Sequence, residues 1–118
     1  MAVTSTRSQT ITFSSDVVGT EVVSAASNAS SPGMIEIKDL SSGFNSITVP
    51  TGGSSVPTSV TIQPPTANST AITIKGVTGD TGIRIHNTDP TTIALHSSVT
   101  TVGLTAGGAI TGVRFFWA

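Results

Sequence analysis

The sequence predicts an all-β protein with a single domain, folded as an antiparallel β-sandwich or a small β-barrel of about eight to ten short strands. Short runs alternate apolar and polar residues, as in Gly82-Ile83-Arg84-Ile85. Turn-forming Gly, Pro, Asn and Asp residues separate the runs, and no stretch shows the apolar spacing of an amphipathic helix. A chain of 118 residues with 36% hydrophobic content can fill one small core.

Ten runs satisfy the strand pattern, each bounded by turn signals. The expected strands are residues 9–13, 17–24, 33–38, 45–49, 59–63, 70–76, 82–86, 92–96, 98–104 and 109–117. Four of the six prolines, Pro50, Pro57, Pro64 and Pro65, fall between residues 43 and 68. Because proline cannot donate to a central ladder, we expect edge strands or a surface loop there.

Residues 82–86 and 92–96 are expected to form an antiparallel hairpin across a loop at residues 87–91. This pairing directs four apolar side chains toward the core and turns two polar ones away. The inward set is Ile83, Ile85, Ile93 and Leu95, and the outward pair is Arg84 and His86.

The last strand carries three of the five aromatic residues of the chain. Alternation puts Phe115 and Trp117 on one face, and Phe116 on the other face with Arg114. Aromatic side chains bury a large apolar area, so this strand is expected to fill the core of its own domain. The alternative is that the aromatic cluster, Phe116 above all, docks on a neighbouring molecule.

The surface is expected to be covered by neutral hydroxyls, since the chain has 21 Thr and 17 Ser but only 9% charged residues. Globular domains average about 25% charged residues. Few charges and a net charge of -1 reduce the repulsion between copies, which favours a structural subunit packed against other copies of itself. The five basic residues are scattered, which argues against nucleic-acid binding.

No apolar run approaches the length of a bilayer span, and the N-terminus lacks the apolar region of a signal peptide, so we expect no membrane association and synthesis in a cytoplasm. The absence of Cys excludes disulfides and thiolate chemistry.

Catalytic and ligand sites are poorly supported by the motifs. His86, Asp89, His96 and Ser97 supply the residue types of a hydrolytic triad, but the predicted hairpin separates the two histidines and no nucleophile-elbow motif occurs. Asp80 lies in a glycine-rich turn that has neither EF-hand nor phosphate-loop spacing. A sugar-binding module usually needs exposed aromatic platforms, and the chain has no Tyr and one Trp. We therefore expect no enzyme activity, cofactor or metal.

The run from Ile72 to His86, with its Gly79-Asp80-Thr81-Gly82 turn, together with Pro90, Leu95 and the closing residues 113–117, resembles small β-rich structural proteins of tailed bacteriophages. At this size the resemblance implies a capsid decoration or cement protein, commonly a trimer or dimer. Such families often carry an N-terminal arm, which implies an arm at residues 1–8 and a folded domain at residues 9–118.

These expectations combine into a virion structural protein that stabilises the major capsid lattice. It would be made in the bacterial cytoplasm and would then lie on the capsid surface, with the major capsid protein and copies of itself as partners. The residues expected at its interfaces are Phe115, Phe116, Trp117, Arg84 and His86. The alternatives are a tail, neck or baseplate component and a host-surface adhesion module that binds glycans.

Overall fold

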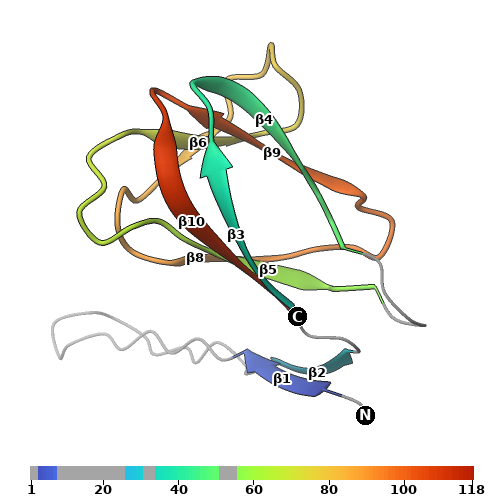
Figure 1. The fold of residues 1–118 in the computed structure, drawn as a ribbon. Helices are drawn as coiled ribbons and strands as arrows, with labels where there is room; N and C mark the ends of the chain where they lie inside the picture. The colour runs from blue at the N-terminus through green and yellow to red at the C-terminus, as the bar shows by residue number, and fades with distance from the viewer. Residues whose placement is uncertain (1–2, 8–25, 31–33, 51–55) are drawn as a thin grey trace, which may run out of the picture.

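Strands form almost all of the regular structure in the computed structural model, which describes residues 3–7, 26–30, 34–50 and 56–118 (Figure 1). Near the N-terminus, β1 (Val3–Arg7) pairs antiparallel with β2 (Ala26–Ser30). Eight further strands follow: β3 (Met34–Leu40), β4 (Gly43–Thr48), β5 (Ser59–Gln63), β6 (Ile72–Lys75), β7 (Ile83–Ile85), β8 (Thr91–Ala94), β9 (Thr101–Ala106) and β10 (Ile110–Trp117). The predicted all-β class is confirmed.

The eight strands β3 to β10 are nested in pairs. The first pairs with the last, β3 with β10, and the series continues inward through β4 with β9 and β5 with β8 to β6 with β7. This is the pattern of one long hairpin that has been rolled up. Rolling brings β10 beside β5 and β9 beside β6.

The result is two four-stranded antiparallel sheets, β3-β10-β5-β8 and β4-β9-β6-β7 (Figure 1). This strand order is that of a jelly roll, a sandwich in which the chain here crosses to the other sheet at every connection except that from β6 to β7. Of the two predicted architectures, the structure therefore has the sandwich. In the described part of the chain no helix is long and apolar enough to cross a bilayer.

The predicted hairpin between residues 82–86 and 92–96 is wrong. Both segments are strands, but β7 pairs with β6 in one sheet, and β8 pairs with β5 in the other. Ile85 is buried as expected, whereas Ile83 lies at the sheet margin and is 74% exposed. The loop after β7 crosses between the sheets, because β7 pairs with the preceding strand β6 while β8 pairs with β5 in the other sheet.

The region from residue 43 to 68 also differs from its expected form. β4 is an edge strand, but β5 lies inside its sheet between β10 and β8. The prolines flank β5 at Pro57 and Pro64 without interrupting it, so every residue of the strand keeps its amide donor. The predicted strands at residues 9–13 and 17–24 lie outside the described residues, and the division at residue 8 stays a prediction.

β10 supplies the largest side chains of the core. Val113, Phe115 and Trp117 point inward and are at most 2% exposed, and the rings of Phe115 and Trp117 stack with their centroids 6.0 Å apart. They belong to one cluster with buried apolar residues of both sheets, among them Ile72 and Leu104. The prediction that this strand fills its own core is confirmed.

A β-bulge at residues 111 and 112 sets the inward face of β10. Ile110 is opposite Leu40 but Val113 is opposite Lys38, so β10 has one extra residue there. Gly112 adopts a φ of +83°, which disfavours any side chain, and its amide donates to Asp39 Oδ1 at 2.9 Å. The bulge allows Ile110 and Val113 both to be buried.

Adjacent aromatic residues of β10 offer a direct test of this core. Replacing Phe115 by alanine is expected to lower the free energy of unfolding by about 3–5 kcal/mol, because it leaves a cavity between the sheets. Phe116→Ala is the matched control, expected to cost about 1 kcal/mol because its side chain lies on the outer face. Denaturant unfolding measures both, and equal losses would contradict the assignment of faces.

Candidate interaction surface

An apolar strip lies on the outer face of the β3-β10-β5-β8 sheet. It consists of Ile35 and Ile37 on β3 and Phe116 on β10, with Ile35 directly opposite Phe116 in the register. Ile35 is 66% exposed and Ile37 65% exposed, while Phe116 is half-buried. Isolated apolar residues are common on protein surfaces, but neighbouring ones on a rigid sheet are typical of a contact site.

The alternation of β3 explains why its isoleucines face outward. Leu40 is buried in the core, and residues at even positions share its side of the strand, so Glu36 and Lys38 point inward at the margin of the sandwich. Lys38 Nζ lies 3.5 Å from Glu36 Oε2. The other carboxylate oxygen, Glu36 Oε1, is buried without a hydrogen-bond partner among the described residues.

Away from the strip, the outer faces of the sheets are rich in hydroxyls. In the same sheet, Thr61 of β5 and Thr92 of β8 lie side by side with their hydroxyl oxygens 2.8 Å apart. The outward positions of the opposite sheet include Ser46, Thr48, Thr73, Thr101 and Thr105. The strip therefore borders a hydroxyl-rich surface and the charged Arg114, which lies opposite Ile37, while two other exposed apolar side chains, Val77 and Ile83, lie in the loop before β7 and in β7 itself.

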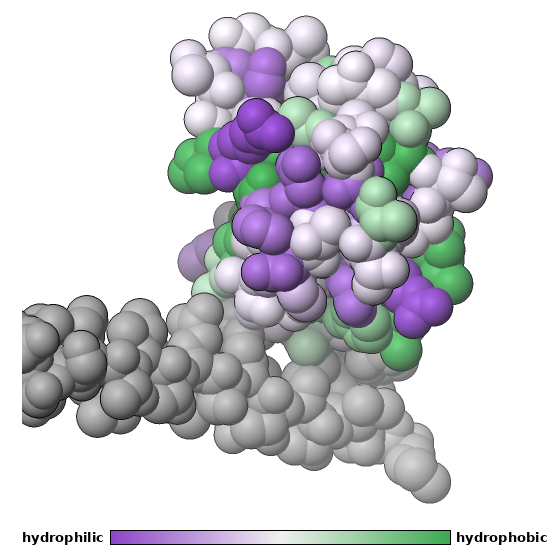
Figure 2. Space-filling view, turned by 90° about the vertical axis from the view of Figure 1, so that its left-hand side faces the viewer, coloured by the Kyte–Doolittle hydropathy of each residue, from purple (hydrophilic) through white to green (hydrophobic). Residues whose placement is uncertain are grey.

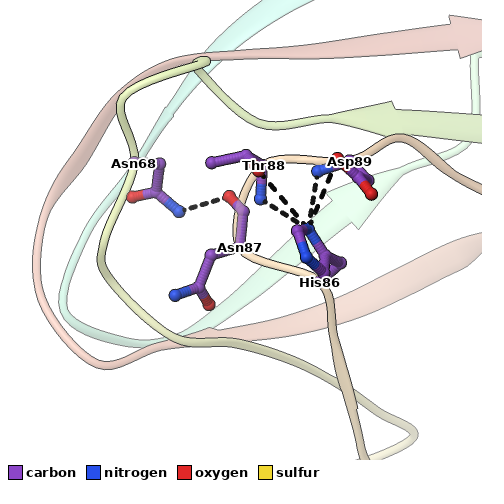
Figure 3. A network of polar contacts seen from close by, with 5 residues as sticks. All are labelled: Asn68, His86, Asn87, Thr88 and Asp89. Carbon is purple, nitrogen blue, oxygen red and sulfur yellow. Dashed lines mark hydrogen bonds and ion pairs between the residues drawn. The ribbon is translucent and has the colours of Figure 1, made fainter.

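A shallow, widely open hollow, called here the polar hollow because most of its lining residues are polar, lies at one end of the sandwich between the loops at residues 66–70 and 86–90. Hydrophilic side chains gather on this side of the molecule (Figure 2). The lining includes Asn68, Arg84, His86 and Asn87. Asn68 Nδ2 donates to the carbonyl of Asn87 at 2.8 Å, which ties the two loops together (Figure 3). It also donates to the carbonyl of Thr70 in its own loop at 2.9 Å.

Each histidine caps the turn that follows it. His86 Nδ1 accepts from the backbone amides of Thr88 at 3.2 Å and Asp89 at 2.9 Å (Figure 3). His96 Nδ1 accepts from the amide of Ser98 at 3.2 Å in the same way. These bonds occupy Nδ1, so Nε2 carries the proton of the neutral ring. Both side chains thus have a clear structural role.

The structure does not assemble the residue types of a triad. Asp89 lies near His86, with 3.7 Å between Asp89 Oδ1 and His86 Nδ1, whereas the hydroxyl on His96 comes from Ser98 at 2.9 Å. Among the described residues, no group of three or more His, Asp or Glu side chains could hold a metal ion.

The five predicted interface residues fall into three environments. Phe115 and Trp117 are buried in the core, which removes them from the surface that a partner can reach. Phe116 lies in the apolar strip, while Arg84 and His86 are exposed at the polar hollow. The structure brings the last two together but separates them from Phe116.

Ile35 and Ile37 lie on the surface but are not among the five interface residues predicted from the sequence. Their alternation with Glu36 and Lys38 would normally place isoleucines in the core. The only contrary signal in the sequence is that Met34 and Leu40, at the ends of the same strand, are apolar in the opposite phase.

Comparison with protein-family models, with curated proteins and with solved structures gives no match for this chain. The resemblance to phage structural proteins therefore stays a prediction.

The loop contacts of the hollow can be tested at Asn68. We expect Asn68→Ala to lower the free energy of unfolding by about 1–2 kcal/mol, because it removes the hydrogen bond that joins the loops and the two bonds to Thr70 within its own loop. It should also speed amide hydrogen exchange in residues 84–89. Asn87→Ala is the control, because Asn68 bonds only the main-chain carbonyl of Asn87 and that bond survives. Unchanged exchange in Asn68→Ala would contradict the link.

Proposed function

We propose that this protein is a structural subunit of a bacteriophage particle, most simply a decoration or cement protein that stabilises the major capsid lattice. The observation that carries the structural part is the apolar strip, an exposed apolar surface on a rigid sheet in a protein with 9% charged residues. The phage setting comes from the resemblance at residues 72–86 and 113–117.

The fold supports this role by analogy. Jelly rolls are common in viral capsid domains, although they also occur in lectins and cupins, so the architecture alone does not determine function. The hydroxyls on the outer faces of both sheets can hydrogen-bond across a contact at a small desolvation cost. Binding to the assembled lattice would stabilise the shell by mass action, with no catalytic step.

In this proposal the protein is made in the bacterial cytoplasm and binds the capsid surface through the major capsid protein. The apolar strip supplies the contact area, and Arg84 and His86 at the polar hollow remain available for a second contact. Nucleic acid and membrane have no part in it.

The direct test is mass spectrometry of purified particles from a phage that encodes this chain. A copy number comparable to that of the major capsid protein is expected for a decoration protein. A few copies per particle would instead indicate a tail, neck or baseplate component, and absence from the particle would overturn the proposal.

The strip itself can be tested by replacing Ile35 and Ile37 with threonine. Threonine keeps the β-branched shape, so the fold should persist while retention on isolated capsids falls by about tenfold or more, since two exposed apolar side chains are lost. Ile83→Thr is the matched control, because Ile83 is 74% exposed on the other sheet. Equal effects from both changes would remove the strip from the contact.

A host-surface adhesion module is the second candidate, favoured by the polar hollow. Its lining supplies amide, guanidinium and imidazole groups that could bind sugar hydroxyls, although no aromatic platform is among its lining residues. Binding of the isolated protein to glycans, abolished by Arg84→Ala and unaffected by the paired threonine change in the strip, would favour this candidate over the capsid role.

A further inference from the structure

β3 presents an open edge. It is the outermost strand of its sheet, and among residues 34–50 and 56–118 no strand pairs with its free side. With seven residues, β3 is also the longest edge strand of the two four-stranded sheets, since β4, β7 and β8 have six, three and four residues. A long edge with unpaired backbone groups is a template for another strand.

Charged side chains that point inward often protect such an edge against pairing. Here the two charges have opposite sign and are two residues apart, at Glu36 and Lys38. An antiparallel copy of β3 centred on Ile37 would place Glu36 opposite Lys38 of the partner subunit and Lys38 opposite Glu36 of the partner subunit. In this register each charge lies opposite a charge of the other sign. Glu36 and Lys38, which would otherwise disfavour edge pairing, therefore favour this one register.

The two adjacent registers, centred on Glu36 and on Lys38, are both disfavoured. Centring the pair on Glu36 would put two carboxylates directly opposite each other, which is destabilising. Centring on Lys38 would do the same with two ammonium groups. The register at Ile37 is thus the one near the middle of the strand that opposes unlike charges.

We propose that β3 pairs antiparallel with β3 of a second copy of this chain, across a two-fold axis at Ile37. The pairing joins two sheets into one of eight strands. Side chains directly opposite in an antiparallel pair have Cβ atoms about 5 Å apart, so Lys38 of the partner subunit can reach Glu36. Glu36 Oε1 is already buried within the single chain, so the contact uses the accessible part of the Glu36 side chain, which is 27% exposed.

The pairing also joins the two apolar strips on the outer face. Ile37 meets Ile37 of the partner subunit at the axis, whereas Ile35, next to Phe116, lies opposite Asp39 of the partner subunit, so the two strips touch at the Ile37 pair. The inference deepens the proposed function and rests on it, because it specifies the self-contact through which a doubled apolar strip would be presented to the capsid.

Cysteine cross-linking tests the register, and the natural chain has no Cys to interfere. Opposite residues have Cα atoms about 4.5–5.5 Å apart, within the range of a disulfide. Ile37→Cys is therefore expected to form a disulfide-linked dimer under mild oxidation. In Ile35→Cys, the control, the two cysteines would be four residues apart along the strands, about 13 Å, and should not link.

Charge changes test the complementarity. Glu36→Lys and Lys38→Glu, made singly, each place like charges opposite at two symmetry-related positions, so the dimer should dissociate about tenfold more readily. The double change Glu36→Lys with Lys38→Glu restores unlike charges and should restore the dimer. Sedimentation of the isolated full chain measures all three, with denaturant unfolding of each variant as the check on the monomer.

The proposal would be overturned by equal cross-linking of both cysteine variants or by failure of the double charge change to recover dimerisation. It would also be overturned by a chain that stays monomeric while the β3 amides resist hydrogen exchange, since another segment of the same chain would then cover the edge. These measurements use the isolated protein, so they test the dimer separately from the phage role. If the dimer forms but the chain is absent from phage particles, only the proposed function is contradicted.

Discussion

The burial of the inward face of β10 is the constraint on which the rest of the structure depends. Phe115 and Trp117 stack between the sheets and are almost fully buried, and β10 is hydrogen-bonded on one side to β3 and on the other to β5. The last strand therefore joins the beginning and the middle of the jelly roll. The main chain of Ala118 extends this link by bonding Ser59 in both directions, with N–O distances of 3.0 Å.

That central strand also shapes the outer surface. Because β10 alternates, burial of Phe115 and Trp117 requires Phe116 to face outward, where it lies opposite Ile35. The bulge at Gly112 lets Leu40 and Ile110 enter the core together. With Leu40 inward, Glu36 and Lys38 lie at the sandwich margin and the isoleucines face solvent. The apolar strip is thus a consequence of core packing.

The two candidate surfaces differ in chemistry and in place. The strip is apolar and lies on a sheet, where the backbone is held by ladder hydrogen bonds. The hollow is polar and lies between loops that are held by Asn68 and by the turn around His86. A rigid apolar face suits a permanent contact with other subunits, whereas a polar loop cluster suits a smaller or more specific ligand. The structural role proposed for the protein rests on the first of these.

The sequence by itself determined the all-β class, most strand positions in the described region and the inward face of the last strand, because period-two alternation and turn residues are local signals. Tertiary structure alone decided the pairing of β7 and β8 and the central place of β5, since strand partners depend on segments distant in the chain. It also decided the orientation of β3. Ile35 and Ile37 compete there with Met34 and Leu40 for the core, and only the neighbouring β10 resolves that competition.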